Sequence, residues 1–173
     1  MATIATLKRL SPTSLSELIL AERDPSNPSV AIIDVRDDDH IGGHIKGSQN
    51  VPSRLLDAMM PTLVRQLQDK KTVVFHCALS QQRGPGAALR YIRERERMFA
   101  IKSRGSTAAG SAESSAEGES ATEELSSDSN AGHIEQNVYV LDRGFVGWQE
   151  LYGEDERLTE GYRKELWRDG YWG

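Results

Sequence analysis

Cysteine is almost absent from this 173-residue chain, in which Cys77 is the only one. A single cysteine excludes an internal disulfide, and it excludes the metal sites that several cysteines build together. Packing must therefore stabilise the fold, and we expect the Cys77 thiol to be free. We predict no bound metal and no resident cofactor.

Long apolar runs are absent as well. The first residues lack the uninterrupted apolar stretch of a signal peptide, and no later segment approaches the roughly 18 apolar residues of a membrane span. We therefore expect a soluble protein of the cytoplasm, the nucleus or both, with no membrane partner. The sequence leaves the oligomeric state open.

Neither sign of charge is in excess over most of the chain. The formal net charge is −5, but six of the 26 acidic residues lie between residues 105 and 130, where no Lys or Arg occurs. The rest of the chain has 20 acidic residues against 21 basic ones. This balance argues against a nucleic-acid partner.

The acidic stretch belongs to a low-complexity segment, residues 102–133, which consists mainly of Ser, Ala, Gly and Glu. Its few large apolar side chains bury too little surface to offset the entropy lost on ordering. We predict a disordered surface insertion within a single domain that spans residues 1–173.

Outside this insertion, apolar runs alternate with helical patterns. Three runs read as strands buried on both faces: VAIIDV (30–35), TVVFHC (72–77) and NVYVL (137–141). Helical spacing occurs over residues 11–22, where Ser14 is the predicted cap, and over 53–68, 87–99 and 145–152. Alternation of this kind predicts an α/β domain with a mostly parallel central sheet flanked by helices. Its ligands bind beyond the carboxyl ends of strands, where Cys77 stands.

The C-terminal residues 156–173 carry Leu158, Tyr162 and Leu166 at positions i, i+4 and i+8. This spacing predicts a C-terminal helix and tail that pack on the flank of the sheet.

The stretch FHCALSQQRGPG (75–86) combines a strand end, a short loop and a helix that opens at Gly84 and Pro85. Loop N–H groups and a helix N-terminus then surround one point, an arrangement that binds a tetrahedral anion. The same positive potential favours the thiolate of Cys77, which makes it a nucleophile. Arg83 can present its planar fork to two oxygens of the anion.

Other residues near the loop are candidates for binding or support. The predicted oxyanion-binding residues are Ala78, Leu79, Ser80, Gln81, Gln82 and Arg83. The Ser80 hydroxyl is placed to donate to the sulfur or to a leaving oxygen. His76 either supports the thiolate or has a structural role in its strand, and Asp142 and Arg143 are possible supporting residues because their strand should end near the loop.

Two motifs resemble the rhodanese-like superfamily. DVRDDDHIGGHIKGSQNVP (34–52) is similar to its D-V-R, G-H-I and N-V-P signature, and YVLDRGFVGW (139–148) to its closing strand and turn. Asp34 and Arg36 are expected to form a structural pair at the strand end. Cys77 to Arg83 spans seven residues, as in the cell-cycle dual-specificity phosphatases and yeast-type arsenate reductases of that superfamily, whereas sulfurtransferases have six.

The resemblance implies a phosphatase in which Cys77 attacks phosphorus and water then hydrolyses a cysteinyl-phosphate. No position matches a general acid with confidence. An arsenate reductase is the first alternative, and because no second cysteine is present it would need an external thiol such as glutathione or glutaredoxin. A module that binds phosphoproteins without turnover is the second. The expected partner is accordingly a phosphoprotein or a small oxyanion.

Overall fold

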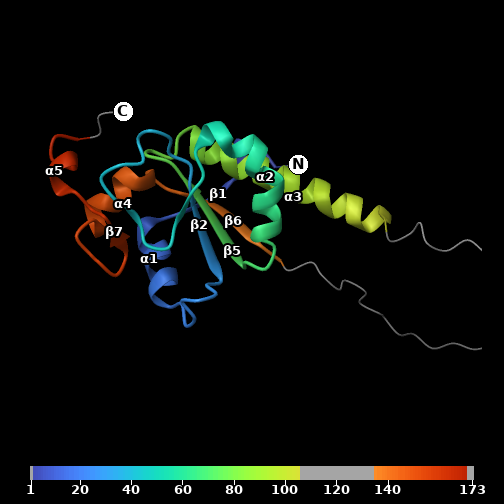
Figure 1. Cartoon of the computed structure of the whole chain (residues 1–173), viewed down its shortest axis with the longest axis horizontal. Helices are drawn as coiled ribbons and strands as arrows, with labels where there is room; N and C mark the ends of the chain where they lie inside the picture. The colour runs from blue at the N-terminus through green and yellow to red at the C-terminus, as the bar shows by residue number, and fades with distance from the viewer. Residues whose placement is uncertain (1, 106–134, 171–173) are drawn as a thin grey trace, which may run out of the picture.

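A five-stranded sheet, with the order β1-β6-β5-β2-β4, forms the centre of the fold (Figure 1). The computed structural model describes residues 2–105 and 135–170. All neighbouring strands of this sheet run parallel, as predicted. The strands are β1 (Lys8–Leu10), β2 (Val30–Asp34), β4 (Gln49–Asn50), β5 (Thr72–His76) and β6 (Asn137–Leu141). A separate antiparallel pair joins β3 (His44–Ile45) to β7 (Thr159–Glu160).

Helices cover both faces of the sheet. On one face α2 (Leu56–Gln66) and α3 (Arg83–Gly105) pack on residues such as Val73 and Phe75. On the other, α1 (Pro12–Leu20) and α4 (Gly144–Tyr152) pack on Ile32 and Val74. The short helices η1 (Ile4–Thr6), η2 (Ser53–Leu55) and α5 (Lys164–Trp167) complete the described part. None of its helices combines the length and apolarity needed to cross a membrane.

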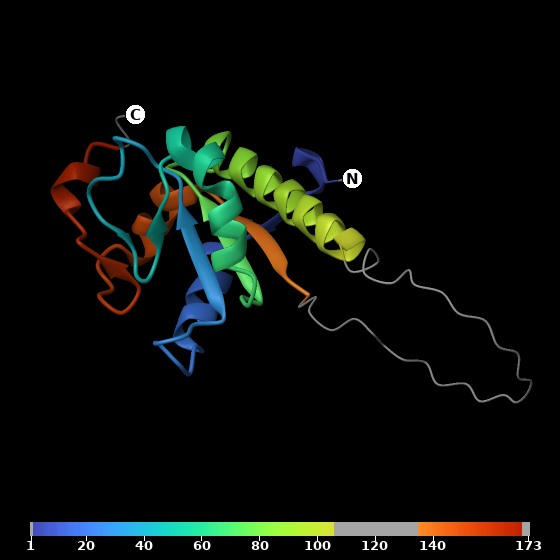
Figure 2. The same cartoon turned by 45° about the vertical axis from the view of Figure 1, so that its right-hand side comes forward.

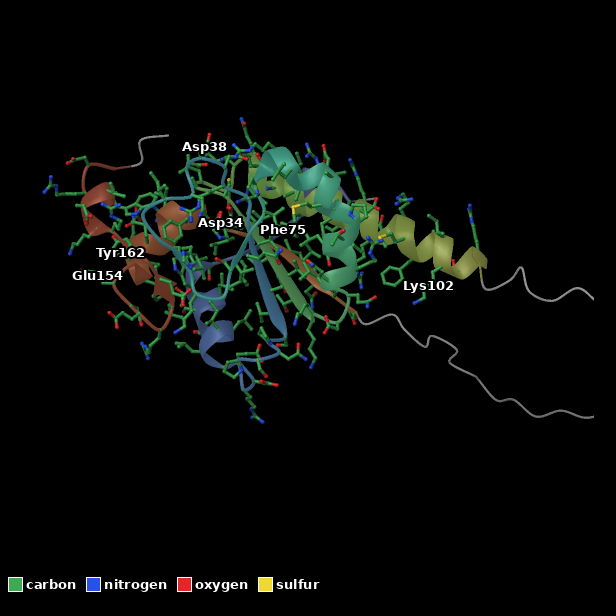
Figure 3. The ribbon with its side chains drawn as sticks, viewed as in Figure 1. Asp34, Asp38, Phe75, Lys102, Glu154 and Tyr162 are labelled. Atoms are coloured by element: carbon green, nitrogen blue, oxygen red, sulfur yellow. The ribbon has the colours of Figure 1, made fainter. Side chains whose placement is uncertain are left out.

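The helix α3 runs past the edge of the sheet, and the figures show its far end, with Lys102, projecting from the body (Figures 2 and 3). Because α3 ends at Gly105, the first four residues of the predicted insertion are helical rather than disordered. The remainder, residues 106–133, lies outside the described residues.

The C-terminal segment differs from its prediction. Instead of one helix, residues 156–170 form a turn, the strand β7 and the single-turn helix α5. Gly161, with φ of +64°, breaks the helical path after β7. Leu158 is nevertheless buried. The apolar spacing therefore predicted burial correctly but predicted the wrong secondary structure.

This segment lies against the chain that connects β2 to β3 (Figure 1). The indole Nε1 of Trp167 donates to the carbonyl of Gly42 at 2.8 Å, and the N–H of Arg163 donates to the same oxygen at 3.2 Å. A Cβ at Gly42 would lie 2.6 Å from that indole nitrogen. The last elements of the chain therefore hold a loop near its beginning.

The cap of α1 also differs from its prediction. Ser11, not Ser14, occupies the cap position, since its hydroxyl accepts from the N–H of Ser14 at 3.1 Å. Pro12 takes the first helical position, where its missing N–H leaves no bond unmade.

Candidate active site

Cys77 lies at the carboxyl end of β5, where the central strands of the sheet terminate together. Its side chain is buried, and the N–H of Ser80 donates to its sulfur at 3.2 Å. Ser80 has φ of +53°, a left-handed conformation that non-glycine residues seldom adopt. This turn brings the chain back toward the sulfur, so that the Ser80 N–H reaches Sγ.

Three carbonyl groups of the loop are held on its outer side. The carbonyls of Cys77 and Ala78 accept from the first turn of α4, from Phe145 N–H at 3.0 Å and Val146 N–H at 2.9 Å. The carbonyl of Ser80 accepts from Nη2 of Arg9 at 3.3 Å. In a trans peptide the next N–H points opposite to the carbonyl. The N–H groups that follow these carbonyls therefore point away from α4 and Arg9.

Gly144 allows the close approach between α4 and the loop. Its φ is +58°, and a Cβ built on it would lie 2.5 Å from the carbonyl oxygens of both Cys77 and Ala78. Only glycine fits this position without displacing the loop.

Arg83 begins α3 and closes the loop. Its Nη1 and Nη2 donate to the two carboxylate oxygens of Asp39 at 2.7 and 2.5 Å, and Nη1 also donates to Asp37 at 3.2 Å. The hydrogen bond from Arg83 to Asp39 raises the pKa of the guanidinium, which stays charged at every physiological pH. In the structure, two carboxylates bind the terminal nitrogens of the Arg83 guanidinium.

A buried polar cluster supports the loop from below. Asp34 and Arg36 are fully buried and form the predicted structural pair, with Nη2 2.7 Å from Oδ2. Arg36 also lies over the ring of Phe145, 4.2 Å from its centroid. Burial opposes ionisation of Asp34, but the hydrogen bonds and the charge of Arg36 overcome it and keep the pKa of Asp34 below the ordinary value.

His76 has a structural position in this cluster. It is fully buried, its Nδ1 lies 3.1 Å from the carbonyl of Cys77, and its Nε2 lies 3.7 Å from Asp34 Oδ2. Burial lowers the pKa of His76, so the imidazole is neutral at pH 7. A neutral ring whose Nδ1–H donates to the carbonyl fixes the strand end that carries Cys77.

The two possible supporting residues after β6 lie on the outer side of the loop. Asp142 pairs with Arg9 at 3.3 Å, and Arg143 pairs with Glu150 of α4 at 2.8 Å. Both line a hollow of about 300 Å³ beside exposed Leu79. Arg9 links Asp142 to the loop, because it also donates to the Ser80 carbonyl.

The loop side chains divide by exposure. Ala78 and Ser80 are buried, whereas Leu79, Gln81 and Gln82 are exposed. The buried Ser80 hydroxyl makes no hydrogen bond within the described residues; the contact of this residue to the sulfur comes from its backbone N–H.

The sequence reasoning missed Asp37, Asp39 and Arg9. A signal for the first two was present, because three successive acids follow the strand β2. The carboxyl end of β2 lies beside that of β5, with Asp34 in register with His76. Arg9 gave no comparable signal, since β1 is only three residues long.

Comparison with known proteins places the chain among relatives of two activities. The rhodanese-like domain family matches residues 15–151. The CDC25-like phosphatase YCH1 of Saccharomyces cerevisiae is 32% identical, over 95% of this chain and 97% of the relative. Arsenate reductase 2.1 of Oryza sativa subsp. japonica is 38% identical, over 85% of this chain and 71% of the relative. The solved structure of Ygr203w, described as a yeast protein tyrosine phosphatase of the rhodanese family, is 28% identical with a TM-score of 0.66, and covers 97% of this chain and 100% of that one.

Proposed function

Because the chain belongs to the rhodanese-like family, we propose that it is a cysteine-dependent phosphatase of the protein tyrosine or dual-specificity type. The observation that carries the proposal is the seven-residue loop from Cys77 to Arg83, which wraps the sulfur and has its first carbonyls tied outward to α4. In the proposed site, the N–H groups that follow these carbonyls and the Arg83 guanidinium form a ring around the nucleophile. Such a ring matches a tetrahedral dianion bearing a leaving group.

In the proposed reaction, the Cys77 thiolate attacks phosphorus in line with the ester oxygen. The S–P bond forms as the P–O bond breaks, and the leaving oxygen takes a proton. Loop N–H groups and Arg83 stabilise the charge on the three equatorial oxygens. Water then attacks phosphorus, the S–P bond breaks, and inorganic phosphate and the thiolate are released.

The proton for the leaving oxygen has no assigned donor. Asp142, which follows a neighbouring strand, is half-exposed and paired with Arg9. A nitrophenyl phosphate does not require a general acid, because its phenolate is a stable leaving group. It is therefore the substrate with which to test the nucleophile alone.

A second candidate function, arsenate reduction, is favoured by the rice relative and by the single cysteine. Cys77 would attack arsenic, so that an S–As bond forms as an As–O bond breaks and the protonated oxygen leaves as water. The thiol of glutathione would then attack the sulfur, so that the two electrons of the S–As bond reduce As(V) to arsenite and a mixed disulfide forms. A second external thiol, such as glutaredoxin, would restore Cys77.

The deciding experiment compares 4-nitrophenyl phosphate hydrolysis by the wild type and Cys77→Ser between about pH 5 and 8. Turnover that disappears in the variant supports the phosphatase. Turnover in neither protein removes it, and arsenate-dependent oxidation of glutathione in the presence of glutaredoxin then tests the reductase. A protein inactive in both assays that still binds a phosphopeptide would be a binding module.

A further inference from the structure

The segment that follows β2, residues 37–39, contacts the arginine of the loop. We propose that Asp39 is a positioning residue that holds Arg83 by its two terminal nitrogens and leaves the other edge of the guanidinium for a tetrahedral oxyanion. The inference rests on the proposed function, because it assigns Arg83 to oxyanion binding.

The atoms used in the contact support this assignment. Asp39 binds Nη1 and Nη2, one carboxylate oxygen to each, and Asp37 accepts a further hydrogen bond from Nη1. A guanidinium has five N–H groups, so these contacts leave the N–H of Nε and one N–H of Nη2. Nε makes no hydrogen bond with any residue in 2–105 or 135–170. The two remaining N–H groups are parallel, on one edge, and match two oxygens of a phosphate-like group.

The two carboxylates are themselves fixed in place. Asp37 accepts from the hydroxyl of Ser53 at 2.5 Å and from the N–H of Arg54 at 3.2 Å, and its own N–H donates to Asp39 at 2.9 Å. Burial opposes ionisation of Asp37, but the hydrogen bonds from Ser53, Arg54 and Arg83 overcome it and lower its pKa. An anchor of this kind remains in place when substrate binds, so the guanidinium loses little rotamer freedom at that step.

A carboxylate at position 39 that competed with the oxyanion, instead of positioning Arg83, would have the opposite effect on oxyanion binding. If the carboxylate competed with the oxyanion for Arg83, its removal would strengthen oxyanion binding. Asp39 binds the two terminal nitrogens Nη1 and Nη2, which favours positioning. A competing carboxylate would instead bind the edge formed by Nε and Nη2, which the oxyanion needs.

Asp38 provides a matched control. It carries the same charge on the same segment, which Figure 3 locates. Its side chain is 91% exposed and pairs with Arg54. Asp39→Asn and Asp38→Asn therefore make the same change of charge at neighbouring positions, and only the first removes a contact to the loop arginine.

The experiment measures binding of inorganic tungstate to the full chain by calorimetry, in the Cys77→Ser background so that no chemistry intervenes. We expect Asp39→Asn to weaken binding by about 10-fold or more, the loss of a charge-assisted contact, and Asp38→Asn to change it by less than about twofold. Arg83→Met should abolish binding. Because Asp39 acts through Arg83, Asp39→Asn should have no further effect in an Arg83→Lys background, whereas a general structural defect would be additive.

The other outcomes separate the two proposals. Tighter binding by Asp39→Asn would show competition and overturn the inference, as would equal binding by the two asparagine variants or additivity with Arg83→Lys. Unchanged binding by Arg83→Met would instead remove the proposed function itself. Circular dichroism of each variant shows that it is folded before it is titrated.

Discussion

Gly144 offers a sharp test of how the loop is held. In the variant Gly144→Ala the new Cβ would lie 2.5 Å from the carbonyl oxygens of both Cys77 and Ala78. The residue must also keep φ of +58° or α4 must begin differently. The methyl group therefore forces the loop and the helix apart at the point where two hydrogen bonds join them.

The magnitude follows from two contributions. A left-handed conformation costs an alanine about 1–2 kcal/mol. Separation of the loop from α4 also weakens the bonds that Phe145 and Val146 donate at 3.0 and 2.9 Å, each of which contributes about 0.5–1.5 kcal/mol. We expect the free energy of unfolding to fall by about 2–5 kcal/mol. We also expect kcat/KM to fall by about 100-fold, because displaced loop amides no longer stabilise the oxyanion.

Gly161→Ala is the matched control for this variant. Gly161 has a similar φ of +64° and no atom within 4 Å of a built Cβ, so its substitution carries the conformational cost alone, about 1–2 kcal/mol. Urea denaturation measures the stability of both variants, and nitrophenyl phosphate hydrolysis measures activity below the unfolding transition. Equal stability and equal kcat/KM in the two variants would refute the reasoning, because the loop would then not depend on the approach of α4.

Three further predictions concern the cluster beneath the loop and its outer side. Burial lowers the pKa of His76 from 6.5, so below that pH the unfolded chain takes up a proton that the native state does not. The free energy of unfolding should therefore fall by about 1.4 kcal/mol for each pH unit below 6.5. Urea denaturation at successive pH values should show a weaker dependence of this free energy on pH in His76→Asn. Arg36→Leu leaves Asp34 buried without its partner and should cost about 3–5 kcal/mol in the same assay, and a cost below about 1 kcal/mol would mean that water solvates the carboxylate. Arg9→Met removes one hydrogen bond from the Ser80 carbonyl and should lower kcat/KM by about 2- to 10-fold, whereas unchanged kinetics would mean that α4 holds the loop alone.

Much of the central fold was predictable because the composition of each interior strand indicates that both of its faces are buried. The runs at 30–35, 72–77 and 137–141 are mainly apolar on both faces, as a strand covered on both sides requires, and all three contribute strands to the parallel sheet. The loop was predictable for a related reason. Its strand, cysteine, arginine and helix start are contiguous in sequence, so their order in space follows from their order in the chain.

The parts that could not be predicted depend on contacts between distant segments. Leu158 and Tyr162 have helical spacing, yet the backbone there is extended because β3 offers it a partner strand and Gly161 interrupts a helix. The partner of Arg83 lies 44 residues away on another loop, and no local pattern states that the two meet.

The contact between Trp167 and Gly42 also bears on the order in which the protein is made. The indole that covers this carbonyl lies 125 residues after it in sequence. At about 5–20 residues per second, the ribosome synthesises it roughly 6–25 s later. A nascent chain that stops short of Trp167 contains the whole cysteine loop, its arginine and the segment that carries Asp39, but the carbonyl of Gly42 is then uncovered. We therefore expect the chain between β2 and β3 to be held only when the C-terminal elements emerge and dock, which is a late step of biosynthesis.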